Sequence, residues 1–95
     1  MNEIEKRIKY YPNGKKKSEG IYKDGKLDGL STVWYENGHK EFEATWKDGE
    51  IDGLATGYHE NGQKRSERIW KDGDVTTFNE WDEDGSLLYS KKFIL

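Results

Sequence analysis

The sequence contains no cysteine, one proline and one methionine among its 95 residues. Without cysteine the chain has no disulfide framework, no thiol chemistry and no cysteine-based zinc site. Disulfides are rare in reducing compartments, so the same absence fits a cytoplasmic protein, which is what we expect. The chain also lacks an apolar run long enough for a membrane-spanning helix or a signal peptide. We therefore expect neither of these segments.

Large aliphatic residues are scarce too. Only 17 residues are Leu, Ile, Val or Phe, a share close to that of disordered chains. The net charge is only −3, however, and aromatic residues make up 14% of the chain, whereas disordered chains combine high net charge with few aromatics. The composition therefore favours a thin sheet carrying aromatic rings over a sandwich with a thick core. The mild acidity argues against a nucleic-acid ligand, which requires a concentrated basic face.

What the sequence does contain is a repeat of 24 residues. Asn-Gly and Asp-Gly pairs alternate along the chain at spacings of 11 and 13 residues, and half of the positions of 11–34 recur identically in 35–58. A degenerate copy of the Asn-Gly block, Asp82-Glu83-Asp84-Gly85, lies one residue earlier than the 24-residue spacing predicts. We therefore expect a single domain over 1–95, with repeats at about 11–34, 35–58 and 59–81 and a partial repeat at 82–95.

Each pair of Asn or Asp with Gly predicts a tight hairpin. Both central residues of a type I′ turn need φ > 0, which Asn, Asp and Gly tolerate best, so we expect type I′ turns at both kinds of pair. The segments between the pairs have strand length and strand composition. The predicted fold class is all-β, a single-layer antiparallel meander of 24-residue β-hairpin repeats, elongated in shape. Strands are expected at about 3–11, 15–22, 26–35, 40–47, 50–59, 64–71, 74–82 and 87–94.

Two-residue loops would also fix the register of the strands. Gly29 then lies opposite Trp46 and Gly53 lies opposite Trp70, so that each ring covers bare backbone. One face of the sheet is expected to carry Tyr22, Leu27, Val33, Tyr35, Phe42, Trp46, Ile51 and Trp70. The opposite face is expected to carry Ile21, Leu30, Trp34, Leu54, Tyr58 and Ile69.

This pattern resembles the MORN repeat variant of many bacterial proteins. The resemblance is carried by Asn13-Gly14, Lys23-Asp24-Gly25, Asp28-Gly29 and their copies, and it covers about residues 10–89. It implies a MORN-like hairpin sheet and, because such proteins often serve as antitoxin components, a toxin as the protein partner. The stricter Gly-x-Gly pattern of membrane-linked MORN repeats is broken here, since Gly57 corresponds to Val33 in the preceding repeat.

No motif in the sequence predicts an enzyme. The aspartates recur at the turns, where we expect them to bond to their own backbone and not to bind calcium. His39 and His59 lack the spacing of metal ligands, and the Gly-rich pieces lack a phosphate-binding pattern. The basic run 15–17 is expected to be a solvated strand face. We predict no catalytic residue, no metal site and no cofactor, because no spacing gathers a base, a nucleophile and an oxyanion donor.

The aromatic residues are the feature that indicates binding. In a single-layer sheet at least one ring face stays wet, and Trp and Tyr are good interface anchors. The leading hypothesis is therefore a non-enzymatic protein-binding module, by resemblance an antitoxin or immunity-type protein that masks a toxin. The alternatives are a carbohydrate- or cell-wall-binding array and a membrane-surface scaffold. The predicted partner contacts are Trp34, Trp46, Tyr58 and Trp70, with Glu43 and Glu67 steering a basic partner.

Overall fold

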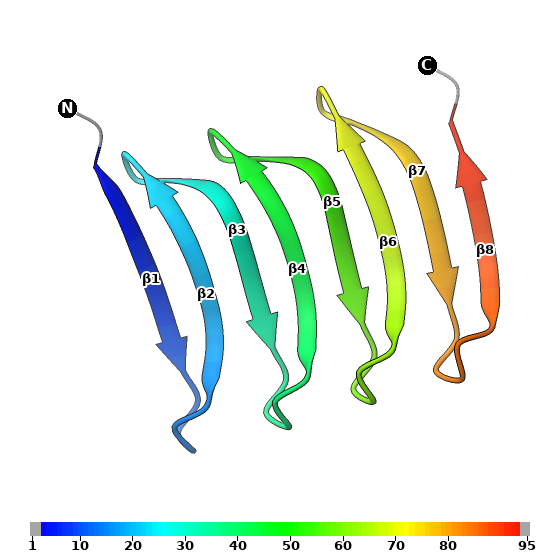
Figure 1. Cartoon of the computed structure of the whole chain (residues 1–95), viewed down its shortest axis with the longest axis horizontal. Helices are drawn as coiled ribbons and strands as arrows, with labels where there is room; N and C mark the ends of the chain where they lie inside the picture. The colour runs from blue at the N-terminus through cyan, green and yellow to red at the C-terminus, as the bar shows by residue number, and fades with distance from the viewer. Residues whose placement is uncertain (1–2, 94–95) are drawn as a thin grey trace.

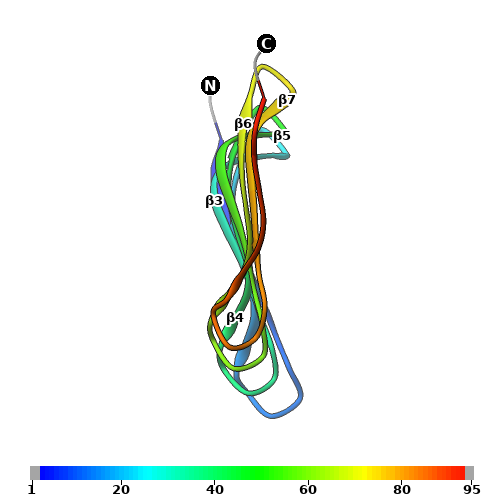
Figure 2. The ribbon, with the colours of Figure 1, turned by 90° about the vertical axis from the view of Figure 1, so that its right-hand side faces the viewer.

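A computed structural model describes residues 3–93 of the chain and shows one antiparallel sheet whose strand order follows the chain order (Figure 1). The molecule measures 43 × 39 × 10 Å, which is the thickness of one layer, and the edge-on view of Figure 2 shows the twist of this thin slab. The predicted all-β, single-layer meander is confirmed; the last residue of the expected strand 87–94 lies outside the described part. The strands are β1 (Ile4–Tyr10), β2 (Lys16–Lys23), β3 (Lys26–Trp34), β4 (Lys40–Lys47), β5 (Glu50–Tyr58), β6 (Lys64–Lys71), β7 (Asp74–Trp81) and β8 (Leu87–Lys92).

The Asp-Gly pairs form the hairpins that join β2 to β3, β4 to β5 and β6 to β7. In the first of them Asp24 has φ of 50° and Gly25 has φ of 83°, and the other two pairs repeat these values closely. Two successive residues with φ > 0 are the mark of a type I′ turn, whose twist matches that of the flanking strands. The prediction of type I′ turns is confirmed at these three positions.

The Asn-Gly pairs do not form type I′ turns, so this part of the prediction is wrong. Gly38 has φ of 93°, but Asn37 does not have a positive φ. The amide of Gly38 donates to the carbonyl of Tyr35 at 3.0 Å, and the Asn37 side chain accepts from the amide of His39 at 2.9 Å. This is a type I turn followed by a left-handed glycine, a three-residue loop. The Asn side chain favours it because it bonds to the backbone two residues ahead.

The expected register survives this change because a bulge compensates for the longer loop. Trp34 pairs with Lys40 next to the turn, but Val33 already pairs with Phe42, so one residue of β4 is skipped. The pairings of Gly29 with Trp46 and of Gly53 with Trp70 are therefore as predicted.

The reason for the two strand glycines differs from the expected ring cover. Gly29 has φ of 125° and Gly53 has φ of 96°, a region that residues with a side chain rarely adopt. A Cβ built on Gly29 would meet Ile21 first, and one built on Gly53 would meet nothing within 4 Å. The glycines therefore serve a bulge that bends the strand, and Figure 1 shows β3 and β5 turning sharply near this point.

The bulge differs in length between the repeats. Between the pairs Ala44–Ala55 and Trp46–Ile51, β5 uses two residues more than β4, and β3 has the same surplus against β2. Between the pairs Ile69–Thr77 and Trp70–Val75, β7 has a surplus of only one residue over β6. The last repeat lacks a glycine here. This missing bulge residue is why the fourth turn arrives one position early.

The two faces of the sheet have different characters. We call the face that carries Tyr22, Trp46 and Trp70 the ring face, because these three rings occupy the same slot on alternate strands. Its most buried apolar residues are small: Ala44 and Ala55 are 1% and 5% exposed. Ala44 is buried because Phe42 and Trp46 stand on either side of it on the same strand and face, and Ala55 lies between Ala44 and the longer Arg68 on the neighbouring strands.

The opposite face, which we call the ladder face, carries a row in which glutamates alternate with threonines and, at the last position, with an asparagine. Glu43 pairs with Thr32 on one side and Thr56 on the other, and the Thr32 hydroxyl lies 2.9 Å from the Glu43 carboxylate. Both threonines are buried. Cross-strand pairs of this kind stabilise a sheet by a few tenths of a kcal/mol, up to about 1 kcal/mol each. The row is Glu19, Thr32, Glu43, Thr56, Glu67 and Asn79.

Candidate functional site

The ring face is recessed along β5, toward each of the two ends of this strand. Ala55 and Gly57 present almost no side chain there, while β4 and β6 on either side present larger residues. Two hollows lie along this strand. They are separated by the small side chains of Ala44 and Ala55 and by Arg68, which pairs with Ala55.

The first hollow, which we call the tryptophan hollow, lies at the end of the sheet that holds the Asp-Gly turns. Its lining is mostly apolar, with Glu50 as its charged residue. The pairings of Trp46 with Ile51 and of Trp70 with Val75 place both indoles on the ring face, two strands apart. The two rings are therefore separated by about 9.6 Å of sheet, with β5 between them. The lining residues are Trp46, Glu50, Ile51, Trp70 and Gly73.

The second hollow, which we call the glycine hollow, surrounds Gly57 and is larger and more charged. It exists because two positions lost bulk relative to the preceding repeat: Gly57 stands where Val33 stands, and Ser66 stands where Phe42 stands. A Cβ on Gly57 would come 2.8 Å from the Ser66 hydroxyl, so this pairing keeps the floor free of side chains. The lining residues are Tyr35, Glu41, Phe42, Gly57, Tyr58, Glu60, Arg65, Ser66, Arg68 and Glu80.

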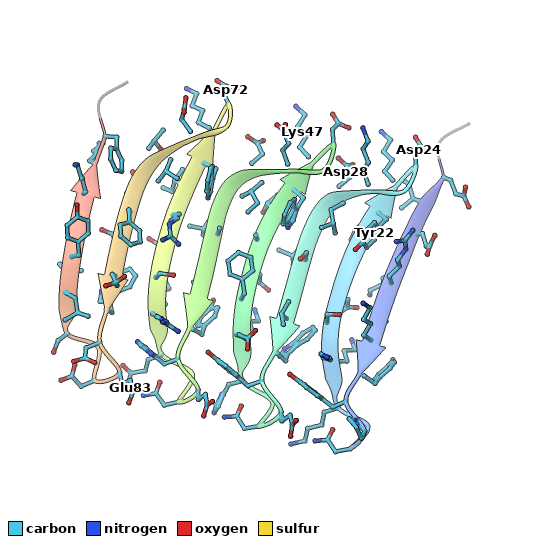
Figure 3. All side chains as sticks on the ribbon, turned by 180° about the vertical axis from the view of Figure 1, so that it is seen from behind. Tyr22, Asp24, Asp28, Lys47, Asp72 and Glu83 are labelled. Atoms are coloured by element: carbon cyan, nitrogen blue, oxygen red, sulfur yellow. The ribbon has the colours of Figure 1, made fainter. Side chains whose placement is uncertain are left out.

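The tryptophan hollow is continued at the end of the sheet by an open junction between hairpins. In the preceding repeat this junction is closed: the amide of Gly49 donates to the carbonyl of Leu27 at 2.8 Å, and the amide of Asp48 donates to Asp28 Oδ1 at 3.2 Å. Among residues 3–93 no hydrogen bond joins the Asp72-Gly73 turn to β5. A cleft remains there, lined by Lys47, Asp48, Glu50, Ile51, Asp52, Asp72 and Gly73. Figure 3 shows Asp28, Lys47 and Asp72 along this end of the sheet.

The closed and the open junction differ in one charge beside the turn. In the closed junction the stem of Lys26 packs against the turn, with its carbons 3.8 Å from a Cβ built on Gly49. The equivalent residue in the next repeat is Glu50, and nothing lies within 4 Å of a Cβ built on Gly73. Lys26 attracts the acidic turn at Asp48, whereas Glu50 repels the acidic turn at Asp72.

The structure places the predicted partner contacts on both faces. Trp46 and Trp70 lie on the ring face and line the tryptophan hollow. Trp34 lies on the ladder face, where the ammonium group of Lys16 is 5.9 Å from the centroid of its ring. Strand alternation from Gly57 directs the Tyr58 side chain to that face too, close to Lys40, although the residue also borders the glycine hollow. A single flat partner can therefore contact one pair of these aromatic residues at a time.

Glu43 and Glu67, predicted to steer a basic partner, lie on the ladder face and are already paired. Lys40 Nζ lies 2.9 Å from Glu43, and Lys64 Nζ lies 3.0 Å from Glu67. The bond to Glu43 raises the pKa of Lys40 above its ordinary value. Each carboxylate is thus largely neutralised by a lysine of the same chain, and their role as partner contacts stays a prediction.

Sequence reasoning missed Glu50, Ser66 and the open junction. The signal for Ser66 was present, because Ser66 and its cross-strand partner Gly57 both depart from the preceding repeat by losing a large side chain. Glu50 stands where the preceding repeat has Lys26. The effect of this charge change cannot be inferred from the sequence, because the sequence does not show which turn of the neighbouring hairpin lies beside this residue.

Neither a metal-binding cluster nor a membrane-spanning helix is found in the part of the chain that the structure describes. Within residues 3–93 no group of three or more His, Asp or Glu side chains is arranged to hold a metal ion. The same residues include no helix with the length and hydropathy needed to cross a bilayer.

Comparison with protein families gave a match over most of the repeats. The family profile described as MORN repeat variant matches three consecutive stretches, residues 6–24, 27–48 and 51–72. Together they cover about two thirds of the chain, and each contains one Asn-Gly turn and ends at the Asp of an Asp-Gly turn. Neither the curated proteins nor the solved structures gave a significant match.

Proposed function

The chain belongs to the MORN repeat variant family, and its repeats support a binding role in general. We propose that it is a non-enzymatic protein whose ring face binds a partner protein. The observation that carries the proposal is the pair of hollows in line along β5, one walled by Trp46 and Trp70 and the other floored by Gly57. Tryptophan in a hollow surrounded by polar residues is the usual anchor of a protein interface.

The dimensions of the sheet support a protein as the ligand. The ring face extends over 43 × 39 Å, and a standard interface buries about 800 Å² on each partner. Both hollows are shallow and open to one side of a flat slab, which suits side chains that protrude from a folded partner. The rigid hairpins require little ordering on binding, so less free energy is lost to immobilisation.

The family resemblance supports a finer proposal about the partner. Proteins with these repeats often serve as antitoxins, so we propose that the partner is a toxic protein encoded by the adjacent gene, which this chain masks. Masking requires only a broad contact that covers the active surface of the partner, and it requires no catalysis by this chain.

The binding test uses two matched substitutions and the purified product of the adjacent gene. Ser66→Phe introduces the residue that the preceding repeat has at this position and fills the glycine hollow; the ring covers Gly57, so the sheet is expected to keep its stability. Ser18→Phe makes the same change at the equivalent position of the first repeat, away from both hollows. We expect calorimetry to show at least a tenfold loss of affinity for Ser66→Phe and an unchanged affinity for Ser18→Phe. Equal affinities for the two variants would contradict the proposed ring-face site.

The antitoxin test is a growth experiment. Expression of the adjacent gene alone should arrest growth of the host, and co-expression of this chain should restore it, with Ser66→Phe restoring it less than Ser18→Phe. Normal growth without this chain would rule out a toxin as the partner while leaving a protein-binding role open.

A further inference from the structure

The tryptophan hollow combines aromatic walls with carboxylates that have no basic partner. None of the ion pairs among the described residues uses Asp48, Glu50, Asp52 or Asp72, although each ladder-face glutamate is bonded to a lysine. Lys47 is the one basic residue in the lining of the adjoining cleft. The rim of the hollow is therefore negative overall, and its walls are the electron-rich faces of two indoles.

The first repeat shows which group fits such a slot. Tyr22 occupies in the first repeat the position that Trp46 and Trp70 occupy in the next two, and the guanidinium of Arg7 lies 4.0 Å from the centroid of the Tyr22 ring. Arg7 Nε donates to Glu5 at 2.8 Å on the same strand. A ring, a guanidinium and a carboxylate thus form one unit on the ring face, at the slot that every repeat carries.

In the tryptophan hollow two of these three parts are present. Trp46 and Trp70 supply the rings and Glu50 supplies the carboxylate. Arg68, two residues before Trp70 on the same strand, is engaged elsewhere, because its guanidinium lies 4.4 Å from the centroid of the Phe78 ring. Indole binds cations better than phenol does. Arginine is favoured over lysine at such a slot because its planar fork can stack on a ring and bond a carboxylate at the same time.

We propose that the tryptophan hollow receives an arginine side chain of the partner protein, with the guanidinium against an indole and bonded to the Glu50 carboxylate. The proposal rests on the proposed function and names the chemistry of the partner at that same face. The open junction at Asp72-Gly73 gives the guanidinium room to enter from the end of the sheet, and the surrounding aspartates draw a cation toward it.

The test uses a small probe and the four indole N–H signals of the protein in nuclear magnetic resonance spectra. The probe is N-acetyl-arginine methylamide, compared with the citrulline and lysine analogues up to about 20 mM, since a single side chain binds in the millimolar range. We expect the arginine probe to shift the signals of Trp46 and Trp70 and to leave those of Trp34 and Trp81 unchanged. Citrulline should give no shift because it lacks the charge, and lysine should give a smaller one.

Matched carboxylate substitutions sharpen the test. Glu50→Gln should weaken binding of the arginine probe about fivefold, as expected for one exposed charged bond. Glu83→Gln removes a carboxylate at the opposite end of the sheet, as Figure 3 shows, and should change nothing. The proposal is overturned if the arginine probe gives no shift, if citrulline or lysine shifts the indoles as strongly, or if the two variants bind the probe equally.

The same variants separate this inference from the proposed function. If Ser66→Phe weakens binding of the adjacent gene's product but Glu50→Gln does not, the ring-face site stands and the arginine is excluded. If neither substitution affects that partner, the ring-face site itself is excluded, whatever the probe does.

Discussion

Two junctions between neighbouring hairpins have almost the same sequence and different structures. The first brings Leu27-Asp28-Gly29 against the Asp48-Gly49 turn, and the second brings Ile51-Asp52-Gly53 against the Asp72-Gly73 turn. The first is closed by two hydrogen bonds and the packed stem of Lys26; the second is a cleft. A repeat protein can thus form a site by leaving out contacts that its other repeats make, without adding any new motif.

The largest expected difference between the junctions lies in their bulge glycines. Gly29→Ala should lower the free energy of unfolding by about 2–3 kcal/mol and Gly53→Ala by about 1–2 kcal/mol, because both force a side chain into the left-handed region. The extra cost at Gly29 arises because its Cβ would lie 3.3 Å from Ile21, whereas the space at Gly53 is open. Urea unfolding followed by tryptophan fluorescence measures both. A larger loss at Gly53 would refute the contrast.

The aspartates of the two junctions provide a second test. Asp28→Ala removes the acceptor of the Asp48 amide and should cost about 1 kcal/mol. Asp52→Ala removes no such bond and should cost less than about 0.5 kcal/mol. The same unfolding experiment compares them, and equal losses would mean that the second junction is closed in solution.

Exchanging the charges at the two junctions should close the open junction and open the closed one. Glu50→Lys places a cation beside the Asp72 turn and should stabilise the protein by about 0.5 kcal/mol, and Lys26→Glu should destabilise it by a similar amount. Hydrogen exchange of the Gly73 amide should slow in the first variant, and that of Gly49 should accelerate in the second. If neither rate changes, charge does not control the junction.

The smallest expected effect concerns acid, and it contrasts the paired carboxylates of the ladder face with the unpaired ones of the cleft. Hydrogen bonds from Lys6 and Lys16 lower the pKa of Glu19 below its usual 4.5. A lowered pKa in the folded state adds stability above pH 4.5 and loses it as the pH falls through the folded value. Glu19→Gln should therefore be less stable than the unchanged chain near neutral pH and equal to it in stronger acid. Glu50→Gln is the control: it removes a carboxylate that none of the ion pairs among the described residues uses, and it should not lower the stability near neutral pH.

Much of the fold follows from the sequence because each turn is encoded locally. The Asp-Gly pairs specify both φ values of a type I′ turn, and the register follows from the loop lengths. The Asn-Gly turns were mistaken for the same type because the dipeptide alone does not show that Asn37 bonds to the amide of His39, which keeps Asn37 at negative φ. The register remained correct only because a bulge in β4 offsets the longer loop.

The site is less visible in the sequence because it depends on differences between repeats. Trp46 and Trp70 could be named from their spacing, and the predicted register already placed them on the face opposite to Trp34 and Tyr58, as the structure has them. The missing bulk at Gly57 and Ser66 can be seen in the repeat alignment. The consequence of exchanging Lys26 for Glu50 cannot, since it requires knowing which turn faces that position.

One recurring contact at the Asn-Gly end of the sheet affects how hairpins can be added to or removed from such an array. The hydroxyl of Tyr35 donates to the backbone carbonyl of Tyr58 at 2.6 Å, Tyr11 bonds in the same way to the carbonyl of Trp34, and the His59 ring lies 2.9 Å from the carbonyl of Trp81. Every residue has a carbonyl, so this link does not depend on which side chain the next unit carries. Hairpins joined in this way are interchangeable parts: one can be duplicated, lost or exchanged while the ones beside it keep their attachment.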